Sequence, residues 1–365
     1  MFRYFFLLIF CLILFGCDIE EDASTEPLDP PSKIEFQSMG LEGLIINQFE
    51  KSVFDDSITA ATSAGVFILN NSSDWQLISN DDWYVRDVVS LYPEHLIASV
   101  SVNENEFLYE TRNNGASWEI ISTNFGGPNP QPTSELYEPA NRLMFDDTLG
   151  VLYAVGYGVL AKSDDFGITW QELSGEWQTF ATGLFTLLKM PASSEIWFGG
   201  QNAIEGALLR SFDENTLETI NYTSVVDVLE SPSSVKSINL VGSNKERVVV
   251  SGEGGIVFSD DSGESWAALI EDENSRFYFD LVELGTSNLL VTSSWAKNFD
   301  SSQPLILEVS SDGGGSWHKY TLDDNDLFGG VWSLTFKESE EFFIVYLGLY
   351  KGGVFQVQIP KDFVN

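Results

Sequence analysis

Short runs of apolar and β-branched residues, separated by segments rich in Gly, Asn, Asp and Ser, extend along most of the chain. Clear examples are residues 44–49 (LIINQF), 57–62 (SITAAT), 65–69 (GVFIL), 151–163 (VLYAVGYGVLAKS), 331–336 (VWSLTF), 342–348 (FFIVYLG) and 353–360 (GVFQVQIP). Runs of this length between turn residues are typical of β-strands. Long amphipathic stretches with helical periodicity are missing from the sequence. The pattern therefore predicts an all-β fold.

An eight-residue pattern, Ser/Thr-x-Asp/Asn-x-Gly-x-Ser/Thr-Trp, recurs four times. The copies are residues 111–118 (TRNNGASW), 163–170 (SDDFGITW), 259–266 (SDDSGESW) and 310–317 (SSDGGGSW). The Asp or Asn can accept hydrogen bonds from backbone N–H groups further along a turn, and the Gly allows a positive φ. The closing Trp is large and apolar, and we expect it to be buried where the chain re-enters a sheet. Each copy is therefore predicted to be a structural turn between two strands.

Two weaker copies, residues 70–75 (NNSSDW) and 211–215 (SFDEN), complete the series. The closing aromatic positions are Trp75, Trp118, Trp170, a missing one placed near Leu217, Trp266 and Trp317. Their spacing gives a period of roughly 43–52 residues, with about four strands in each unit. A repeat of this length and content is typical of a β-propeller.

The chain divides into seven such units. The first six are residues 43–79, 84–122, 142–173, 184–222, 237–270 and 277–322. The seventh offers only three strands before the chain ends, and residues 34–39 (IEFQSM) are predicted to supply its fourth. Pairing the two ends in this way removes exposed sheet edges. We therefore predict one seven-bladed β-propeller over residues 33–365, closed by an N-terminal strand; six blades and a separate hairpin is the alternative.

The repeated turn resembles the Asp-box, or BNR, repeat of sialidase-like, xyloglucanase, sortilin-type and photosystem II assembly-factor propellers. The resemblance covers residues 33–360 and depends on the four complete copies. It implies that the Asp-boxes lie at the blade periphery and that ligands bind on the opposite, central face. The residues of the Asp-boxes would then have a structural role only.

The N-terminus carries the features of a lipoprotein. Residues 4–15 form an apolar run after the single charge of Arg3, which is typical of a signal sequence. Residues 14–17 (LFGC) resemble a bacterial lipobox, which implies a signal peptide over residues 1–16 and a lipid on Cys17. Residues 17–32 are acidic and rich in Pro, Ser and Thr, and are predicted to form a flexible tether. An uncleaved anchor or an ordinary signal sequence is the alternative.

These features predict a membrane-anchored protein outside the cytoplasm, facing the periplasm or exposed on the cell surface. The acidic run of residues 18–22 resembles the surface-export signal of Bacteroidota lipoproteins, and a simple acidic linker is the alternative. Cys11 lies in the removed segment, so no disulfide is expected in the mature chain.

The charge balance excludes several classes of partner. The chain has 18 Lys and Arg against 55 Asp and Glu, a formal net charge of −37, which would repel nucleic acid and anionic lipid headgroups. His95 and His318 are the only histidines, and they offer no zinc pair and no Ser-His arrangement. We therefore expect a monomer with no metal, no cofactor and no nucleic-acid partner.

Several residues that precede the inner strands are candidates for the central face. The ligand-binding candidates are Trp83, Tyr84, Arg86, Arg142, Trp177, Tyr278 and Trp295. Aromatic faces with a few charged groups suit sugars or peptide segments. For each of these residues, packing between blades is the alternative.

An enzymatic function would need specific groups. Asp87 and Asp280 fall near the starts of innermost strands and could form the carboxylate pair of a glycosidase. A sialidase-like site would need Arg86, Arg142 and Arg276 to converge on one carboxylate. The Arg-Ile-Pro motif of sialidases is absent from the sequence.

The leading hypothesis from the sequence is a non-catalytic binding or scaffold module for protein or glycan at the cell envelope. The alternative is a glycoside hydrolase, sialidase-like or glucanase-like, that acts on extracellular glycans. A third hypothesis, an assembly factor for a membrane complex, fits less well because the photosystem-related propellers use a basic patch and this chain is strongly acidic.

Overall fold

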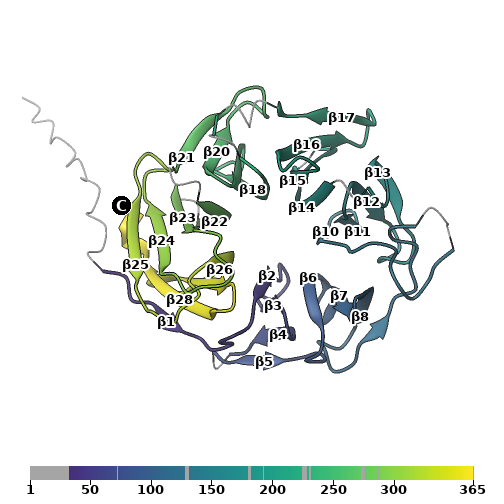
Figure 1. Ribbon diagram of the computed structural model, residues 1–365, viewed down its shortest axis with the longest axis horizontal. Helices are drawn as coiled ribbons and strands as arrows, with labels where there is room; N and C mark the ends of the chain where they lie inside the picture. Colours follow the sequence, from purple (N-terminus) through teal and green to yellow (C-terminus); the bar gives the residue numbers. More distant parts are fainter. Residues whose placement is uncertain are drawn as a thin grey trace, which may run out of the picture.

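The computed structural model describes residues 33–71, 73–127, 131–179, 182–191, 193–223, 228–229, 232–272, 276–285 and 288–364. Within these residues the chain forms seven four-stranded antiparallel sheets, arranged as blades around a central axis (Figure 1). In the first six blades the strands follow sequence order from the axis outward. The seven-bladed propeller predicted from the turn repeat is therefore confirmed.

The strands have the following bounds, given blade by blade from the inner to the outer strand. Blades one to three comprise β2 (Ile46–Lys51), β3 (Ile58–Thr62), β4 (Gly65–Leu69), β5 (Trp75–Leu77); β6 (Tyr84–Tyr92), β7 (His95–Val102), β8 (Asn105–Thr111), β9 (Glu119–Ile120); β10 (Arg142–Asp146), β11 (Val151–Val155), β12 (Val159–Ser163), β13 (Gln171–Gly175). Blades four to six comprise β14 (Thr182–Lys189), β15 (Glu195–Asn202), β16 (Ala207–Asp213), β17 (Glu218–Asn221); β18 (Val235–Val241), β19 (Arg247–Gly252), β20 (Gly255–Ser259), β21 (Ala267–Glu271); β22 (Phe277–Leu284), β23 (Leu289–Trp295), β24 (Leu305–Ser310), β25 (His318–Leu322). Blade seven comprises β26 (Val331–Glu338), β27 (Phe342–Leu349), β28 (Gly353–Pro360) and β1 (Gln37–Ser38), and a short 3-10 helix, η2 (Lys361–Val364), follows β28.

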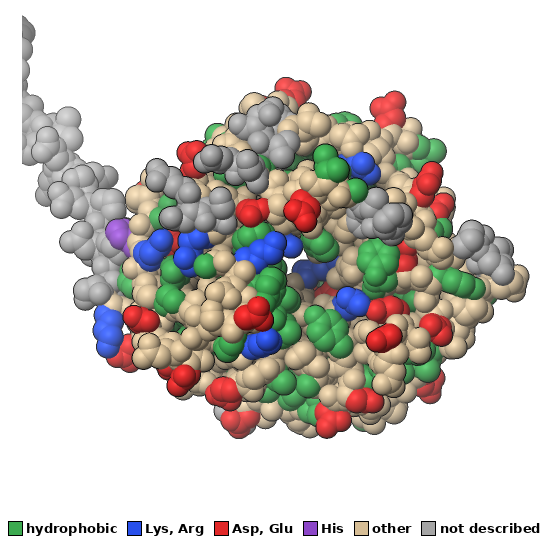
Figure 2. Space-filling view, viewed as in Figure 1, with side chains coloured by type: hydrophobic (Ala, Val, Ile, Leu, Met, Phe, Trp, Pro, Cys, Tyr) green, Lys and Arg blue, Asp and Glu red, His purple; other side chains and the backbone are tan. Residues whose placement is uncertain are grey.

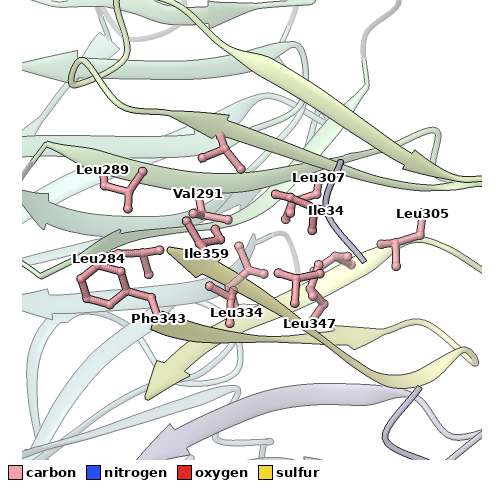
Figure 3. Close-up of a cluster of buried hydrophobic side chains, with 14 of the residues drawn as sticks. Ile34, Leu284, Leu289, Val291, Leu305, Leu307, Leu334, Phe343, Leu347 and Ile359 are labelled. Carbon is pink, nitrogen blue, oxygen red and sulfur yellow. The ribbon is translucent and has the colours of Figure 1, made fainter. Parts of the chain in front are cut away.

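The two ends of the described chain close the ring in blade seven. Strand β1 pairs antiparallel with β28, with Gln37 opposite Gln356 and Ser38 opposite Phe355. Ile34, just before β1, is 6% exposed and packs into the apolar cluster between blades six and seven (Figure 3). The predicted N-terminal closing strand is therefore confirmed, and the alternative of six blades with a separate hairpin is wrong.

Each of the seven blade interfaces has its own apolar core. Middle strands such as β3 are buried along their whole length, because a neighbouring blade covers each face of the sheet. This is why the strands read as continuous apolar runs in the sequence and not as strict alternations of apolar and polar residues.

The four repeated turns connect the third and fourth strands of their blades. In residues 163–170, the hydroxyl oxygen of Ser163 accepts a hydrogen bond from the N–H of Gly167 (2.8 Å), whose φ is 89°. The carboxylate of Asp165 accepts from both the N–H (2.7 Å) and the hydroxyl (2.6 Å) of Thr169. The other three copies have equivalent bonds. The turns are therefore held by their own polar side chains, as the sequence predicts.

The closing Trp of the turn extends this local order to the neighbouring blade. The indole N–H of Trp118 donates to the carbonyl of Ile78 in the preceding blade (2.6 Å), and that of Trp317 donates to the carbonyl of Leu269 (3.3 Å). In these two copies the repeat thus joins consecutive blades as well as consecutive strands, whereas the indole N–H of Trp170 donates to Gly167 of its own turn (3.0 Å).

The features predicted for the first 32 residues lie outside the described part of the chain. These are the signal peptide over residues 1–16, the lipid on Cys17 and the acidic tether over residues 17–32. Among the residues that are described, no helix is long and apolar enough to cross a membrane.

Replacing Asp165 with Ala is expected to lower the free energy of unfolding by about 1–3 kcal/mol, because the turn loses the acceptor for its hydrogen bonds. Asp164→Ala is the matched control, since Asp164 is exposed and belongs to the same turn. Urea unfolding of both variants measures the difference. Equal stability of the two variants would contradict the structural role of the turn.

Deleting residues 33–39 from the full-length chain is expected to destabilise the fold by about 2–5 kcal/mol, because Ile34 leaves an apolar core and the edge of β28 loses its partner. Deleting residues 23–29 from the predicted tether is the length-matched control. Thermal unfolding and light scattering would measure the lower Tm and the association of exposed edges. A Tm unchanged from the control deletion would show that the closing strand is dispensable.

Candidate functional site

A cavity of about 370 Å³ lies at the centre of the ring. Figure 2 shows basic and hydrophobic side chains at the central opening, with acidic side chains close by. Every blade contributes to the wall. Six innermost strands each place one residue at an equivalent position, namely Asn47, Arg86, Phe185, Lys236, Phe279 and Trp332, and blade three contributes Asn141 and Arg142.

A β-bulge brings these side chains to the axis. In six of the seven described innermost strands the pairing register shifts at this position, as between Val85 and Asp87 in β6. The strand without such a shift, β10, begins at Arg142 itself. A bulged residue has no partner in the ladder and its side chain is re-aimed, so Arg86 and its equivalents line the cavity.

The side chain that follows the bulge bonds to the next blade. The carboxylate of Asp87 accepts from the N–H of Leu143 (2.7 Å), and that of Asp280 accepts from the N–H of Leu334 (2.9 Å). In blade seven the hydroxyl of Ser333 accepts from the N–H of Phe49 in blade one (3.0 Å). These bonds satisfy N–H groups on the free edges of innermost strands.

The two carboxylates proposed as catalytic are therefore part of the ring's framework. Each accepts a second backbone bond from its own strand, Asp87 from Val88 (3.0 Å) and Asp280 from Leu281 (2.9 Å). Asp280 borders the cavity, whereas Asp87 is 2% exposed and lies behind the wall. Both side chains already have the hydrogen-bond partners that a buried carboxylate needs.

Burial strongly perturbs three carboxyl groups around the axis. It raises the pKa of Glu50 to about 8 and that of Asp280 to about 6, and it raises the pKa of Asp87 above its ordinary value. The positive charge of Arg142 partly offsets this rise in all three cases. Its Nε atom lies 3.7 Å from a carboxylate oxygen of Asp87. Arg142 is thus the cation that these three buried acids share.

The four basic residues of the cavity wall fall into two kinds. Arg86 pairs with Glu106 through two bonds of 2.6 and 3.0 Å, and Arg142 faces Asp87. The amine of Lys236 instead lies over the rings of Phe185 (4.3 Å) and Phe279 (5.0 Å), and the amine of Lys297 lies over the ring of Phe277 (4.4 Å). Among the described residues, neither lysine has a carboxylate within 4.0 Å. Burial lowers the pKa of Lys236 to about 8.

Of the ligand-binding candidates from the sequence, Tyr84, Arg86 and Arg142 lie on the cavity wall. The other four do not. Trp83, Tyr278 and Trp295 are 3%, 1% and 1% exposed and pack within apolar clusters, and Trp177 packs against Phe125 at 4.9 Å. For Trp83, Tyr278 and Trp295, the alternative of packing between blades describes the structure, whereas Trp177 is partly buried and lines a separate hollow with Trp170.

The three arginines considered for a sialidase-like site do not form one clamp. Arg86 is bound to Glu106, and Arg142 faces Asp87. Arg276 lies outside the cavity wall and donates to the carbonyl of Ser294 (3.1 Å). Capture of a carboxylate by three converging guanidinium groups therefore has no geometric basis here.

The sequence analysis missed most of the wall, including the five residues that share the position of Arg86: Asn47, Phe185, Lys236, Phe279 and Trp332. These five residues belong to a second sequence repeat of four positions. The order of the positions is apolar, variable, polar, apolar. Its copies are residues 46–49 (INQF), 85–88 (VRDV), 184–187 (LFTL), 235–238 (VKSI), 278–281 (YFDL) and 331–334 (VWSL). The variable residue is the one that the bulge turns toward the axis.

No group of three or more His, Cys, Asp and Glu side chains suited to a metal ion occurs in the part of the chain that is described. The cavity offers aromatic rings, amines, guanidinium groups, side-chain amides, hydroxyls and the one carboxyl of Asp280.

No protein-family model matches the chain, and no curated protein matches it. Among solved structures, the chain is similar to the GH74 enzyme of Niastella koreensis, with a TM-score of 0.63 and 14% identity over 88% of this chain and 53% of that chain. It is also similar to the extracellular domain of BT4673 from B. thetaiotaomicron, with a TM-score of 0.61 and 12% identity over 89% and 40% of the two chains. A chain of the mitotic checkpoint complex matches with a TM-score of 0.60 and 11% identity over 97% and 99%.

These likenesses show the fold alone. The chain spans about half the length of the GH74 enzyme that it matches, and 40% of the BT4673 chain. Because proteins as different as a GH74 enzyme and a mitotic checkpoint component share the propeller, the function has to be argued from the cavity itself.

Stability is expected to rise as the pH falls from 8 to 5. Glu50 and Asp280 have folded-state pKa values of about 8 and about 6 against ordinary values of 4.5 and 3.8, so the folded state binds more protons in this range. The contribution is complete below the ordinary values and is lost as the pH rises through 8. His95, whose pKa is lowered, opposes this trend.

The variant Glu50→Gln isolates the effect, because its amide oxygen can still accept from Ser90 and cannot titrate. It is expected to be more stable than the natural chain at pH 8, by on the order of a few kcal/mol, and to have a flatter pH profile. Urea midpoints at pH 5, 6.5 and 8 measure both effects. An unchanged slope in the variant would show that Glu50 titrates normally.

Proposed function

We propose that this protein is a lipid-anchored binding module of the cell envelope, which binds carbohydrate in its central cavity without catalysing a reaction. The observation that carries the proposal is the composition of the cavity wall. It combines aromatic rings with cationic side chains, while its one carboxylate, Asp280, is committed to backbone N–H groups.

The aromatic part of the wall supports a sugar ligand. The rings of Phe279 and Trp332 are stacked, with centroids 5.3 Å apart and planes 3° apart, and Phe185 lies on the same wall. Flat apolar surfaces of this kind suit the C–H faces of pyranose rings, and nearby polar groups fix the orientation of a ligand. The volume of about 370 Å³ is within the range of small-molecule sites.

The four repeated turns, taken as Asp-boxes, give the site its position. In that interpretation the turns hold the outer parts of the blades and leave the central face for the ligand. The lipid on Cys17 and the acidic residues 17–32 would hold the propeller outside the cytoplasm, in the periplasm or on the cell surface. The similarity to an extracellular domain is compatible with that location.

A glycoside hydrolase is the second candidate, favoured by the similarity to GH74 enzymes and by the raised pKa of Asp280, about 6, which would suit a general acid. The hydrogen bonds of Asp280 and Asp87 weigh against it. Both carboxylates would have to break bonds to the backbone of their own and the next blade before they could act.

Truncating Phe185 to Ala is expected to weaken oligosaccharide binding at least tenfold, because the ring is exposed to the cavity and supports no blade interface in the described clusters. A glycan array followed by calorimetry on the full-length protein would identify the ligand and measure its Kd. Ile220→Ala is the control, since Ile220 is 51% exposed on the outermost strand β17.

The same preparations would be incubated with the bound glycans and the products separated. We expect no cleavage. Cleavage that is lost in Asp280→Asn would instead establish the hydrolase. Equal binding by the natural chain and Phe185→Ala would show that the ligand does not bind in the central cavity.

A further inference from the structure

We infer that the ligand of the central cavity carries a carboxylate and that the amine of Lys236 binds it, which makes an acidic sugar at the end of a glycan chain the class of ligand. This inference rests on the proposed function and names the ligand for that site.

The distribution of charge is the first observation. The chain has 18 Lys and Arg against 55 Asp and Glu, yet the cavity wall has four basic residues and a single acidic one, Asp280. Arg86 and Arg142 already face Glu106 and Asp87. The two lysines therefore supply the positive charge that remains for a ligand.

The setting of Lys236 is the second observation. Its amine lies over the rings of Phe185 and Phe279, and the positive charge of Lys297 repels it. The carboxylate of Glu253 offsets this repulsion in part, from beyond ion-pair distance. A cation that is held away from water beside another cation is costly unless an anion accompanies it. A bound carboxylate would replace the lost hydration of Lys236 and relieve its repulsion by Lys297.

The neighbouring rings favour a sugar over an acidic peptide. The stacked pair of Phe279 and Trp332 offers a flat surface directly beside the amine of Lys236, so a ring bearing a carboxylate can contact both at once. The cavity is bounded around the axis by residues of all seven blades and has a volume of about 370 Å³, so a short end of a glycan would enter it along the axis. These contacts match a terminal uronate.

The test compares two probes by calorimetry on the full-length protein: an oligosaccharide that ends in glucuronate and the same oligosaccharide ending in glucose. We expect the acidic probe to bind at least tenfold more tightly at pH 7 in low salt. The preference should decrease at 0.5 M salt, because ions screen the pair. It should also decrease between pH 7 and 9.5, as the amine of Lys236, with its pKa of about 8, loses its proton.

Variants assign the effect to one side chain. Lys236→Met should abolish the preference for the acidic probe, and its Tm should not fall, because the variant removes a costly charge from the cavity wall. Lys236→Arg should retain most of the preference. Lys33→Met, which removes a lysine whose side chain is 76% exposed near the start of the propeller, should have no effect on either probe.

The outcomes separate this inference from the function on which it rests. Equal binding of the two probes, weakened equally by Phe185→Ala, would overturn the inference and leave carbohydrate binding intact. Binding of neither probe, together with no hit on a wider glycan array, would overturn both. Tighter binding of an Asp- and Glu-rich peptide, abolished by Lys236→Met, would overturn the inference of a sugar and show that the ligand is a protein segment.

Discussion

The free edge of each innermost strand is the constraint on which this structure depends. An innermost strand pairs on one side only, so part of its backbone faces the next blade without a strand to bond to. In this chain a side chain supplies the missing acceptor, as Asp87 does for Leu143 and Asp280 for Leu334. The register shift beside each acceptor then points the preceding residue to the axis. The feature that joins the blades therefore also builds the cavity.

This arrangement explains why acidic residues near the axis are poor evidence for catalysis. Asp87, Asp280 and Glu50 each accept a backbone N–H from the following blade, and their burial raises their pKa values. Raised pKa values often mark active sites, but structural carboxylates show them too. Here the hydrogen-bond partners decide between the two interpretations, and they favour a structural role.

The fold could be predicted because its signals are local. A turn such as residues 163–170 needs Asp, Gly and Trp at fixed positions whatever surrounds it, and its spacing along the chain counts the blades. The site could be predicted only in part, because the direction of a side chain in an inner strand depends on a register shift of one residue. Size and aromatic character were a poor guide, since Trp83 and Trp295 fill the apolar interior. The negative net charge of the whole chain likewise gave no indication that the cavity around Lys236 is basic.

The acidic exterior and the basic cavity together act as a filter on ligands. At physiological ionic strength the field of exposed charges decays within about 8 Å, so the exterior repels mainly what comes close to it. A polyanion would have to bring many negative charges against that surface, whereas a mostly neutral glycan would bring only the charge at its end. If such an end entered the cavity, Lys236 and Lys297 would act on it at short range, beside the aromatic rings of the wall. The combination therefore favours one terminal carboxylate over a highly charged chain.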